Sequence, residues 1–189
     1  YFGHTAADAA YIKKTLGKHA ANKLEDGTRF LALIGECLSA GDFVSAKRDW
    51  FKIKQAVDIF HQDFDILMTP TVAALPVPLG SLEMSSGKLF QTKMANALGP
   101  SVARLFKKSL IELTQQEARK NLDKTPFTQL ANLTGQPAMS VPLHWSESGL
   151  PCGTQFIAPF GDEHTLFKLA AQLESAQPWI NKIPQLVKA

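Results

Sequence analysis

Residues 43–64 carry the pattern that most limits the fold. Apolar side chains recur there at intervals of three and four residues, namely Phe43, Ala46, Trp50, Ile53, Val57, Phe60 and Phe64. Because an α-helix turns once every 3.6 residues, this spacing places all of them on one seam of one helix. Phe51 and Ile59 widen the stripe, so we expect burial against a sheet or several helices, with an extended coiled-coil dimer as the alternative.

Shorter signals surround this helix. An Ala- and Lys-rich helix is expected over 5–24, and a core-facing helix from Thr28 to a stop at Gly41. The apolar run Asp65–Thr69, which ends at Pro70, predicts a buried strand of a parallel or mixed sheet. A proline-containing loop over 70–86 should then lead to two helices within 85–124, the second capped by Ser101.

The last third alternates short elements. A helix over 127–133 should end at Gly135, and a strand over 138–141 should stop at Pro142. A polar turn over 146–151 and a second strand over 153–158 predict a hairpin. Asp162 should cap a final helix. This order favours an α/β fold with a mixed β-sheet covered by helices.

Composition limits the function classes. The chain has 189 residues, 45% of them hydrophobic, and its 20 Lys and Arg against 17 Asp and Glu give a formal charge of +3. A chain of this length can bury roughly 70% of its unfolded surface, which excludes disorder as the default. The small charge gives no reason to expect nucleic acid or a membrane as partner. Cys37 and Cys152 form no disulfide framework, so a reducing, cytoplasmic location is expected. The chain starts at Tyr1, without Met, which suggests a fragment.

Most reactive side chains have a structural interpretation. His61, Asp63 and Asp65 are metal-ligand types, but they straddle a predicted helix end and should not converge. Cys152 could act as a nucleophile only with His144 across the hairpin, and a buried structural cysteine is the favoured interpretation. Arg104, Lys107 and Lys108 fit a solvated face. Ser85-Ser86-Gly87 is preceded by no glycine pair and no apolar strand, so the nucleophile elbow of a hydrolase is not predicted there.

Loop positions make a stronger case for a binding site. Ligands of open α/β sheets sit outside the carboxyl ends of strands, and Thr71 follows such an end. Thr125, Thr128 and Asn132 fall at helical spacing beside the element that feeds the next strand. They could face a pocket together. Taken singly, Thr125 also fits a helix N-cap and Asn132 a helix C-terminal cap.

Several ordered blocks resemble the C-terminal part of the amidase signature family. The first is Phe64–Thr71 (FDILMTPT), the second Phe127–Pro142 (FTQLANLTGQPAMSVP), and the third Gly149–Phe156 (GLPCGTQF). Gly161-Asp162-Glu163 and the helix after it match how chains of that family end. The stretch from Thr28 to Phe43 is similar to bacterial amidases acting on linear and cyclic amides, so the resemblance runs from about residue 28 to 180.

The resemblance implies hydrolysis of a carboxamide to a carboxylate and an amine or ammonia. The family uses a serine nucleophile, a second serine in a cis peptide and a lysine, with an acyl-enzyme intermediate and no metal or cofactor. Those residues belong to the family's N-terminal half, and none here matches them, so we expect no catalytic residue in this chain. The resemblance carries over a substrate-pocket role for Thr125, Thr128 and Asn132, with Thr71 nearby.

Two main hypotheses follow. The chain is the C-terminal part of an amidase whose catalytic residues lie upstream, or it is a naturally truncated binding or assembly module. An unrelated hydrolase using Cys152 and His144 is a third. We expect a helical segment over 1–27, an amidase portion over 28–189, and a helical insertion over 85–124 that covers the pocket. Exposed sheet edges and the seam of 43–64 also predict self-association.

Overall fold

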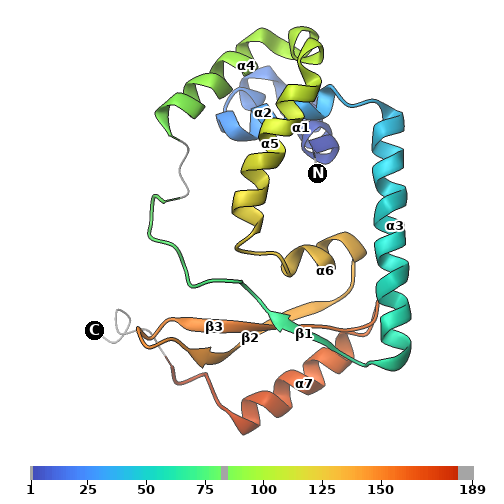
Figure 1. Ribbon diagram of the computed structural model, residues 1–189, viewed down its shortest axis with the longest axis vertical. Coiled ribbons are helices and arrows are strands. Elements are labelled where there is room, and N and C mark those ends of the chain that lie inside the picture. Colours follow the sequence, from blue (N-terminus) through green and yellow to red (C-terminus); the bar gives the residue numbers. More distant parts are fainter. Residues whose placement is uncertain (1, 82–84, 183–189) are drawn as a thin grey trace. The chain divides into compact units, whose positions relative to one another are not determined.

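The computed structural model describes residues 2–81 and 85–182, which form two compact units. Unit 1 comprises Tyr1–Lys47 and Val77–Lys120, and unit 2 comprises Arg48–Pro76 and Asn121–Ala189. The elements, labelled in Figure 1, are α1 (Phe2–Ala21), α2 (Asp26–Glu36), α3 (Ala40–Asp63), β1 (Leu67–Pro70), α4 (Ser86–Leu105), α5 (Lys107–Leu122), α6 (Thr128–Thr134), β2 (Ala138–Trp145), β3 (Pro151–Ile157) and α7 (Glu163–Ala176).

Unit 1 is helical, and its closest packing is between α1 and α2. Gly35 makes this packing possible, because a Cβ at that position would collide with the Phe2 carbonyl oxygen and lie 2.7 Å from the Ala6 Cβ. A small core follows on the other side of α2, where Leu33, Cys37 and Ala103 are buried. The chain bends at Gly99, whose φ of 73° lies in the left-handed region, so the helix break predicted near Ser101 falls just before it, within α4.

Unit 2 is built on a three-stranded sheet with the order β1-β3-β2. Both pairs are antiparallel, with Thr69 and Ser140 each opposite Gln155. One face of the sheet packs against α7 through Val141, Phe156 and Leu166, which form the core of this unit. Figure 1 shows α6 on the other side of the sheet from α7. The α/β class is therefore confirmed, and the site discussed below lies on the α6 side.

Two details of the expected sheet are wrong. The strand 65–69 was expected to belong to a parallel or mixed sheet, whereas both strand pairs of the described sheet, β1 with β3 and β2 with β3, are antiparallel. β2 also runs past Pro142 instead of stopping there. Proline is tolerated at that position because β2 is an outer strand of the described sheet and its register shifts between Pro142 and His144.

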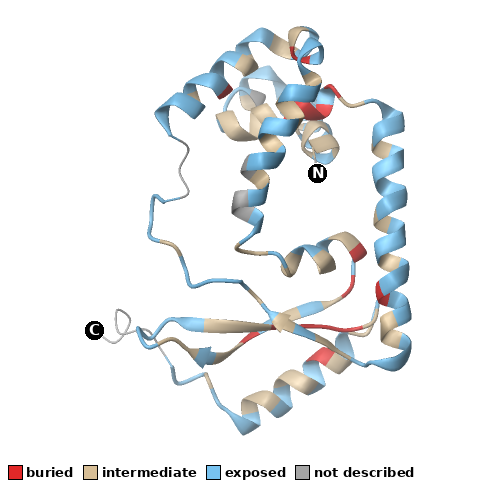
Figure 2. Ribbon diagram, viewed as in Figure 1, coloured by how far each residue is buried: buried red, intermediate tan, exposed pale blue. Residues whose placement is uncertain are grey.

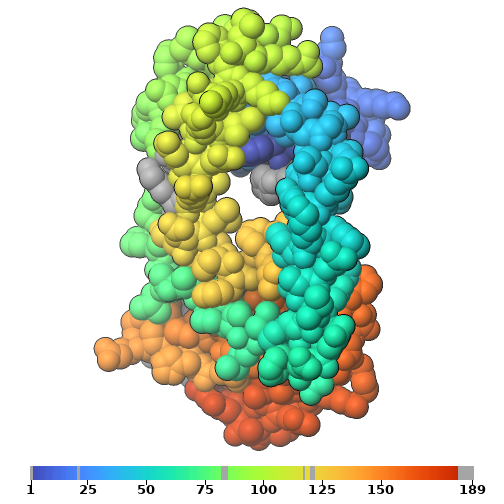
Figure 3. All heavy atoms as spheres, turned by 45° about the vertical axis from the view of Figure 1, so that its right-hand side comes forward, coloured from blue at the N-terminus to red at the C-terminus, as the bar shows by residue number. Residues whose placement is uncertain are grey.

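The seam on α3 is helical as predicted, but it is not buried as predicted. Val57 is buried, whereas Ile53 is 38% exposed and Phe64 is 56% exposed. Figure 2 shows α3 as mostly exposed, and in Figure 3 the helix lies at the molecular surface. The described residues supply Phe60 with a stacked partner in Phe64, at 4.8 Å between ring centroids, but no sheet that covers the seam.

Candidate functional site

A polar row crosses the sheet face that α7 leaves uncovered. Thr69 of β1, Gln155 of β3 and Ser140 of β2 stand opposite one another in register. Since alternate residues of a strand point to opposite faces, these three share a face, while their neighbours Met139, Val141 and Phe156 face the core under α7. The apolar and polar halves of each strand therefore divide the sheet into a packed face and a hydrogen-bonding face.

Gln155 joins this row to the turn before α6. Its side chain is 5% exposed, and its Nε2 donates to the Thr69 hydroxyl at 3.1 Å and to the Phe127 carbonyl at 3.3 Å. A buried carboxamide needs such partners, because leaving them unpaired costs free energy. Gln155 thus fixes the segment around Phe127 against β1, which leads directly to Thr71.

Thr71, just after β1, extends this polar row by contacting Ser140 and Gly153. Its backbone N–H donates to the Gly153 carbonyl at 2.9 Å, and its hydroxyl oxygen lies 2.6 Å from that of Ser140. Glycine is required at 153 for this pair, since a Cβ there would lie 2.6 Å from Ser140 Oγ and 2.7 Å from Thr71 Oγ1. Ser140 remains exposed, so this pair of hydroxyls is open to a ligand from solvent.

The structure places the other predicted site residues at the start and middle of α6. Thr125 lies in the turn before the helix, where its carbonyl accepts a hydrogen bond from the Thr128 hydroxyl at 3.3 Å. Thr128 is half-buried, and Asn132 is exposed one turn later. The cap functions considered for Thr125 and Asn132 are wrong for the helix ends themselves, because Phe127 holds the N-cap position and Gly135 the C-cap with a φ of 75°.

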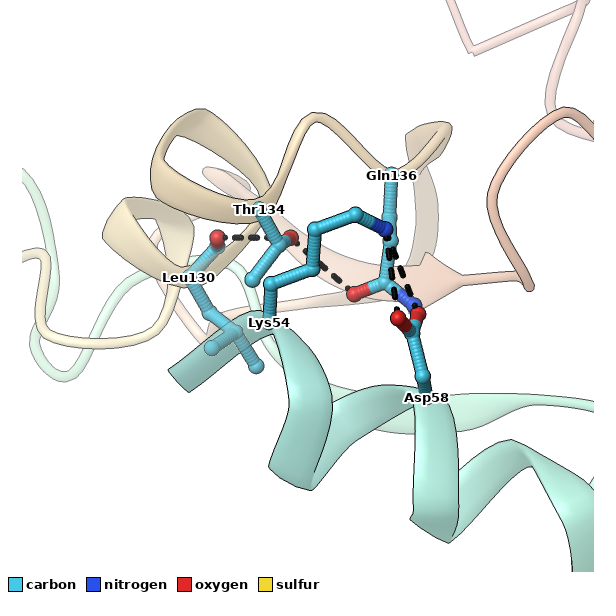
Figure 4. A network of polar contacts seen from close by, with 5 residues as sticks. All are labelled: Lys54, Asp58, Leu130, Thr134 and Gln136. Carbon is cyan, nitrogen blue, oxygen red and sulfur yellow. Dashed lines mark hydrogen bonds and ion pairs between the residues drawn. The ribbon is translucent and has the colours of Figure 1, made fainter. Parts of the chain in front are cut away.

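The far end of α6 lies beside α3 residues of unit 2 (Figure 4). The Thr134 hydroxyl lies 3.0 Å from both the Leu130 carbonyl oxygen and Gln136 Oε1, and it has one proton for the two acceptors. Lys54 and Asp58 of α3 pair with each other at 3.3 Å, and Figure 4 shows them facing Gln136. The Thr134 hydroxyl thus joins the end of α6 to the segment after it, while Lys54 and Asp58 pair within α3.

The remaining reactive side chains do not form a second site. His144 and Cys152 are register partners, but the Cys152 thiol hydrogen-bonds to the Leu150 carbonyl at 3.9 Å. His61 Nδ1 lies 2.9 Å from the Phe64 carbonyl oxygen. Ser85 is the N-cap residue of α4 and Ser86 its first residue. Among the described residues there is no group of three metal-ligating side chains, and no helix long and apolar enough to cross a membrane.

Two surface hollows lie in unit 1, and none of the predicted site residues lines them. The larger has a volume of about 650 Å³ between α1, α2 and α4. The smaller, about 500 Å³, includes Arg104, Lys107 and Lys108 of the predicted basic face. Lys107 Nζ lies 2.7 Å from Asp42 Oδ2, and this hydrogen bond, helped by Ser39, lowers the pKa of Asp42 to about 2.

Sequence reasoning passed over Gln155, Ser140 and Gly153 as site residues. All three lie in blocks that carry the family resemblance, but their own neighbourhoods show only strand patterns. The one signal in the sequence was a polar residue, Gln155, two positions after a glycine within a predicted strand, and its burial is known only from the structure.

Comparison with known proteins gives the family of the chain. The sequence profile of the Amidase family matches residues 2–167. The chain is 32% identical over 154 residues to a lipoamidase of Enterococcus faecalis, covering 82% of this chain and 20% of that protein. It is 32% identical over 124 residues to a 6-aminohexanoate-cyclic-dimer hydrolase of Paenarthrobacter ureafaciens, covering 66% and 21%. An amidase of Pseudomonas putida matches at 25% identity over 188 residues, covering 34% of its own length.

Solved structures show the same fold. A 6-aminohexanoate cyclic dimer hydrolase superposes with a TM-score of 0.72 at 22% identity, over 98% of this chain and 35% of that one. The same enzyme complexed with substrate gives a TM-score of 0.70 at 23% identity, over 96% and 34%. The chain thus spans about a fifth to a third of the length of these relatives. With a family match over most of its residues, the chain belongs to the Amidase family.

Proposed function

We propose that these residues are the C-terminal part of an amidase that hydrolyses a carboxamide to a carboxylate and an amine or ammonia. The observation that carries the proposal is the family match over residues 2–167, in a chain that spans only a fifth to a third of its relatives. In this proposal a serine outside the 189 residues attacks the amide carbonyl, the amine leaves with a proton, and water then hydrolyses the acyl-enzyme. The serine pair and lysine of the family are supplied from there.

The contribution of this chain is one wall of the substrate pocket. Thr71, Thr125, Thr128 and Asn132 are its proposed substrate-binding residues. The support is that Thr71 belongs to a hydroxyl pair open to solvent, and that Gln155 ties β1 to the turn between Thr125 and Thr128. Hydroxyl and amide groups suit a carboxamide, which both donates and accepts hydrogen bonds.

The proposal also covers the segments of the chain, its cellular setting and its self-association. We propose a helical segment over 1–27, the amidase portion over 28–189, and a helical insertion over 85–124. A reducing, cytoplasmic setting is supported by Cys37 and Cys152, which are both free thiols. Self-association is supported by large apolar side chains at the surface, such as Phe51, Ile59 and Phe64.

Hydrolysis of a panel of linear and cyclic amides tests the proposal. The 189-residue chain alone should release no ammonia or amine, whereas the longer protein that contains it should hydrolyse some members. In that longer protein, Thr71→Val should raise KM by about 2- to 13-fold, the loss of one neutral hydrogen bond. Ser175→Ala on α7, an exposed hydroxyl residue on the other side of the sheet, is the control and should leave KM unchanged. Turnover by the isolated chain would contradict the proposal.

A further inference from the structure

The larger hollow of unit 1 has a cationic rim. Lys13, Lys14 and Lys18 of α1 line it together with Arg29 of α2, and Glu36 is the single carboxylate among the described lining residues. Lys13 and Lys14 precede Gly17, where α1 is broken by a φ of 83°, and Lys18 follows it, so the rim includes lysines from both sides of this break. Asp8 and Glu25, the nearby acidic residues in the sequence, are not among the lining residues.

These cations are poorly neutralised. Among the described residues no carboxylate lies within ion-pair distance of Lys13, Lys14 or Lys18. Asp26 is shared by two cations, at 3.7 Å from Arg29 and 3.8 Å from Lys93. With Asp26 and Lys93 included, the groove carries five cations and two carboxylates. That excess of three positive charges equals the formal charge of the whole chain, so the remaining charged residues sum to zero.

The floor of the hollow is apolar. Its lining includes Ala9, Ala10, Ala32, Leu33 and Pro100. Ala32 and Leu33 are buried in the helix packing, which makes the floor a fixed surface. Removing apolar surface from water is favourable, so a molecule that covers this floor gains affinity in addition to its attraction to the rim. A phosphate or another compact anion would pair with the cations of the rim but would leave the apolar floor exposed to water.

We propose that this groove binds a linear carboxylate, with the carboxylate on the lysine rim and the apolar chain along the floor. The site is separate from the polar row of unit 2, and the proposal does not depend on the proposed hydrolysis. Because the cations are at the surface, binding should weaken with salt as the screening length falls from about 10 Å at 0.1 M to about 3 Å at 1 M.

Titration of the 189-residue chain, followed by NMR of backbone amides, tests the proposal. The probes are heptanoate, heptanamide, which keeps the chain without the charge, and acetate, which keeps the charge without the chain. Heptanoate should shift the amides of Ala9, Ala10 and Leu33 at lower concentration than either control. Lys14→Gln together with Lys18→Gln should weaken heptanoate binding by about 2- to 30-fold, as expected for two exposed ion pairs.

The control variant is Lys124→Gln with Lys168→Gln, which removes the same net charge outside the groove and should leave binding unchanged. An equal loss of heptanoate affinity in both double variants would show a nonspecific charge effect and overturn the proposal. So would equal binding of heptanoate and heptanamide, or binding to the 189-residue chain that is lost in the longer protein, where another segment would then occupy the groove.

Discussion

Replacing Gln155 with leucine removes the bonds that tie β1 to the turn before α6. Leucine keeps most of the volume but cannot donate to the Thr69 hydroxyl at 3.1 Å or to the Phe127 carbonyl at 3.3 Å. Each neutral hydrogen bond contributes about 1 kcal/mol net, and the two acceptors are left without their donor. We therefore expect the free energy of unfolding of unit 2 to fall by about 2 kcal/mol.

Tryptophan fluorescence during urea unfolding measures this change selectively, because Trp50, Trp145 and Trp179 all lie in unit 2. Gln129→Leu is the matched control, an exposed glutamine on α6 whose replacement should change the free energy by less than about 0.5 kcal/mol. In the Gln155 variant the amide resonances of Thr71 and Thr128 should also move. If Gln155→Leu unfolds at the same urea concentration as Gln129→Leu, the contacts that define the site are not those described.

Three further predictions concern single contacts. Gly35→Ala should destabilise unit 1 by about 1–3 kcal/mol, because the alanine Cβ would overlap α1, and this outweighs alanine's better helix propensity. Backbone amides of α1 should then exchange their hydrogens faster, and slower exchange would contradict the prediction. Asp162→Ala should lower the free energy of unfolding in the urea assay by about 1 kcal/mol, because the Asp162 carboxylate accepts hydrogen bonds from the Thr165 N–H and hydroxyl. An unchanged urea midpoint would exclude a capping role. The pKa of Asp42, about 2, lies below its unfolded value, so its contribution to stability is present above about pH 4 and is lost as the pH falls toward 2. Lys107→Gln should raise that pKa in an NMR titration of the carboxyl, and no rise would contradict the assigned cause.

Local signals in the sequence predicted local structure well. The stop at Gly135 and the cap at Asp162 are both confirmed, because each depends on the backbone and side chain of one residue. The helix over 43–64 is also confirmed as a helix. Its burial could not be predicted, because periodicity shows which side of a helix is apolar but not what covers it.

Long-range pairing was the part that local patterns could not give. Gln155 contacts Thr69, which is 86 residues away, and the hydroxyl pair joins Thr71 to Ser140 over 69 residues. Both depend on the antiparallel strand order β1-β3-β2, whereas the apolar run over 65–69 predicted only a strand of a parallel or mixed sheet. The sequence therefore allowed each of Thr71, Thr125 and Thr128 to be proposed separately. Gln155 and Ser140, which connect this region, could be identified only from the strand register.

The position of the nucleophile tests the central claim most directly. A fluorophosphonate forms a bond from phosphorus to an activated serine oxygen and releases fluoride, and mass spectrometry then locates the modified peptide. We predict that the longer protein is modified at one serine outside the 189 residues, with parallel loss of amidase activity, and that the 189-residue chain alone is not modified. Modification of a serine within this chain that abolishes hydrolysis would contradict the account.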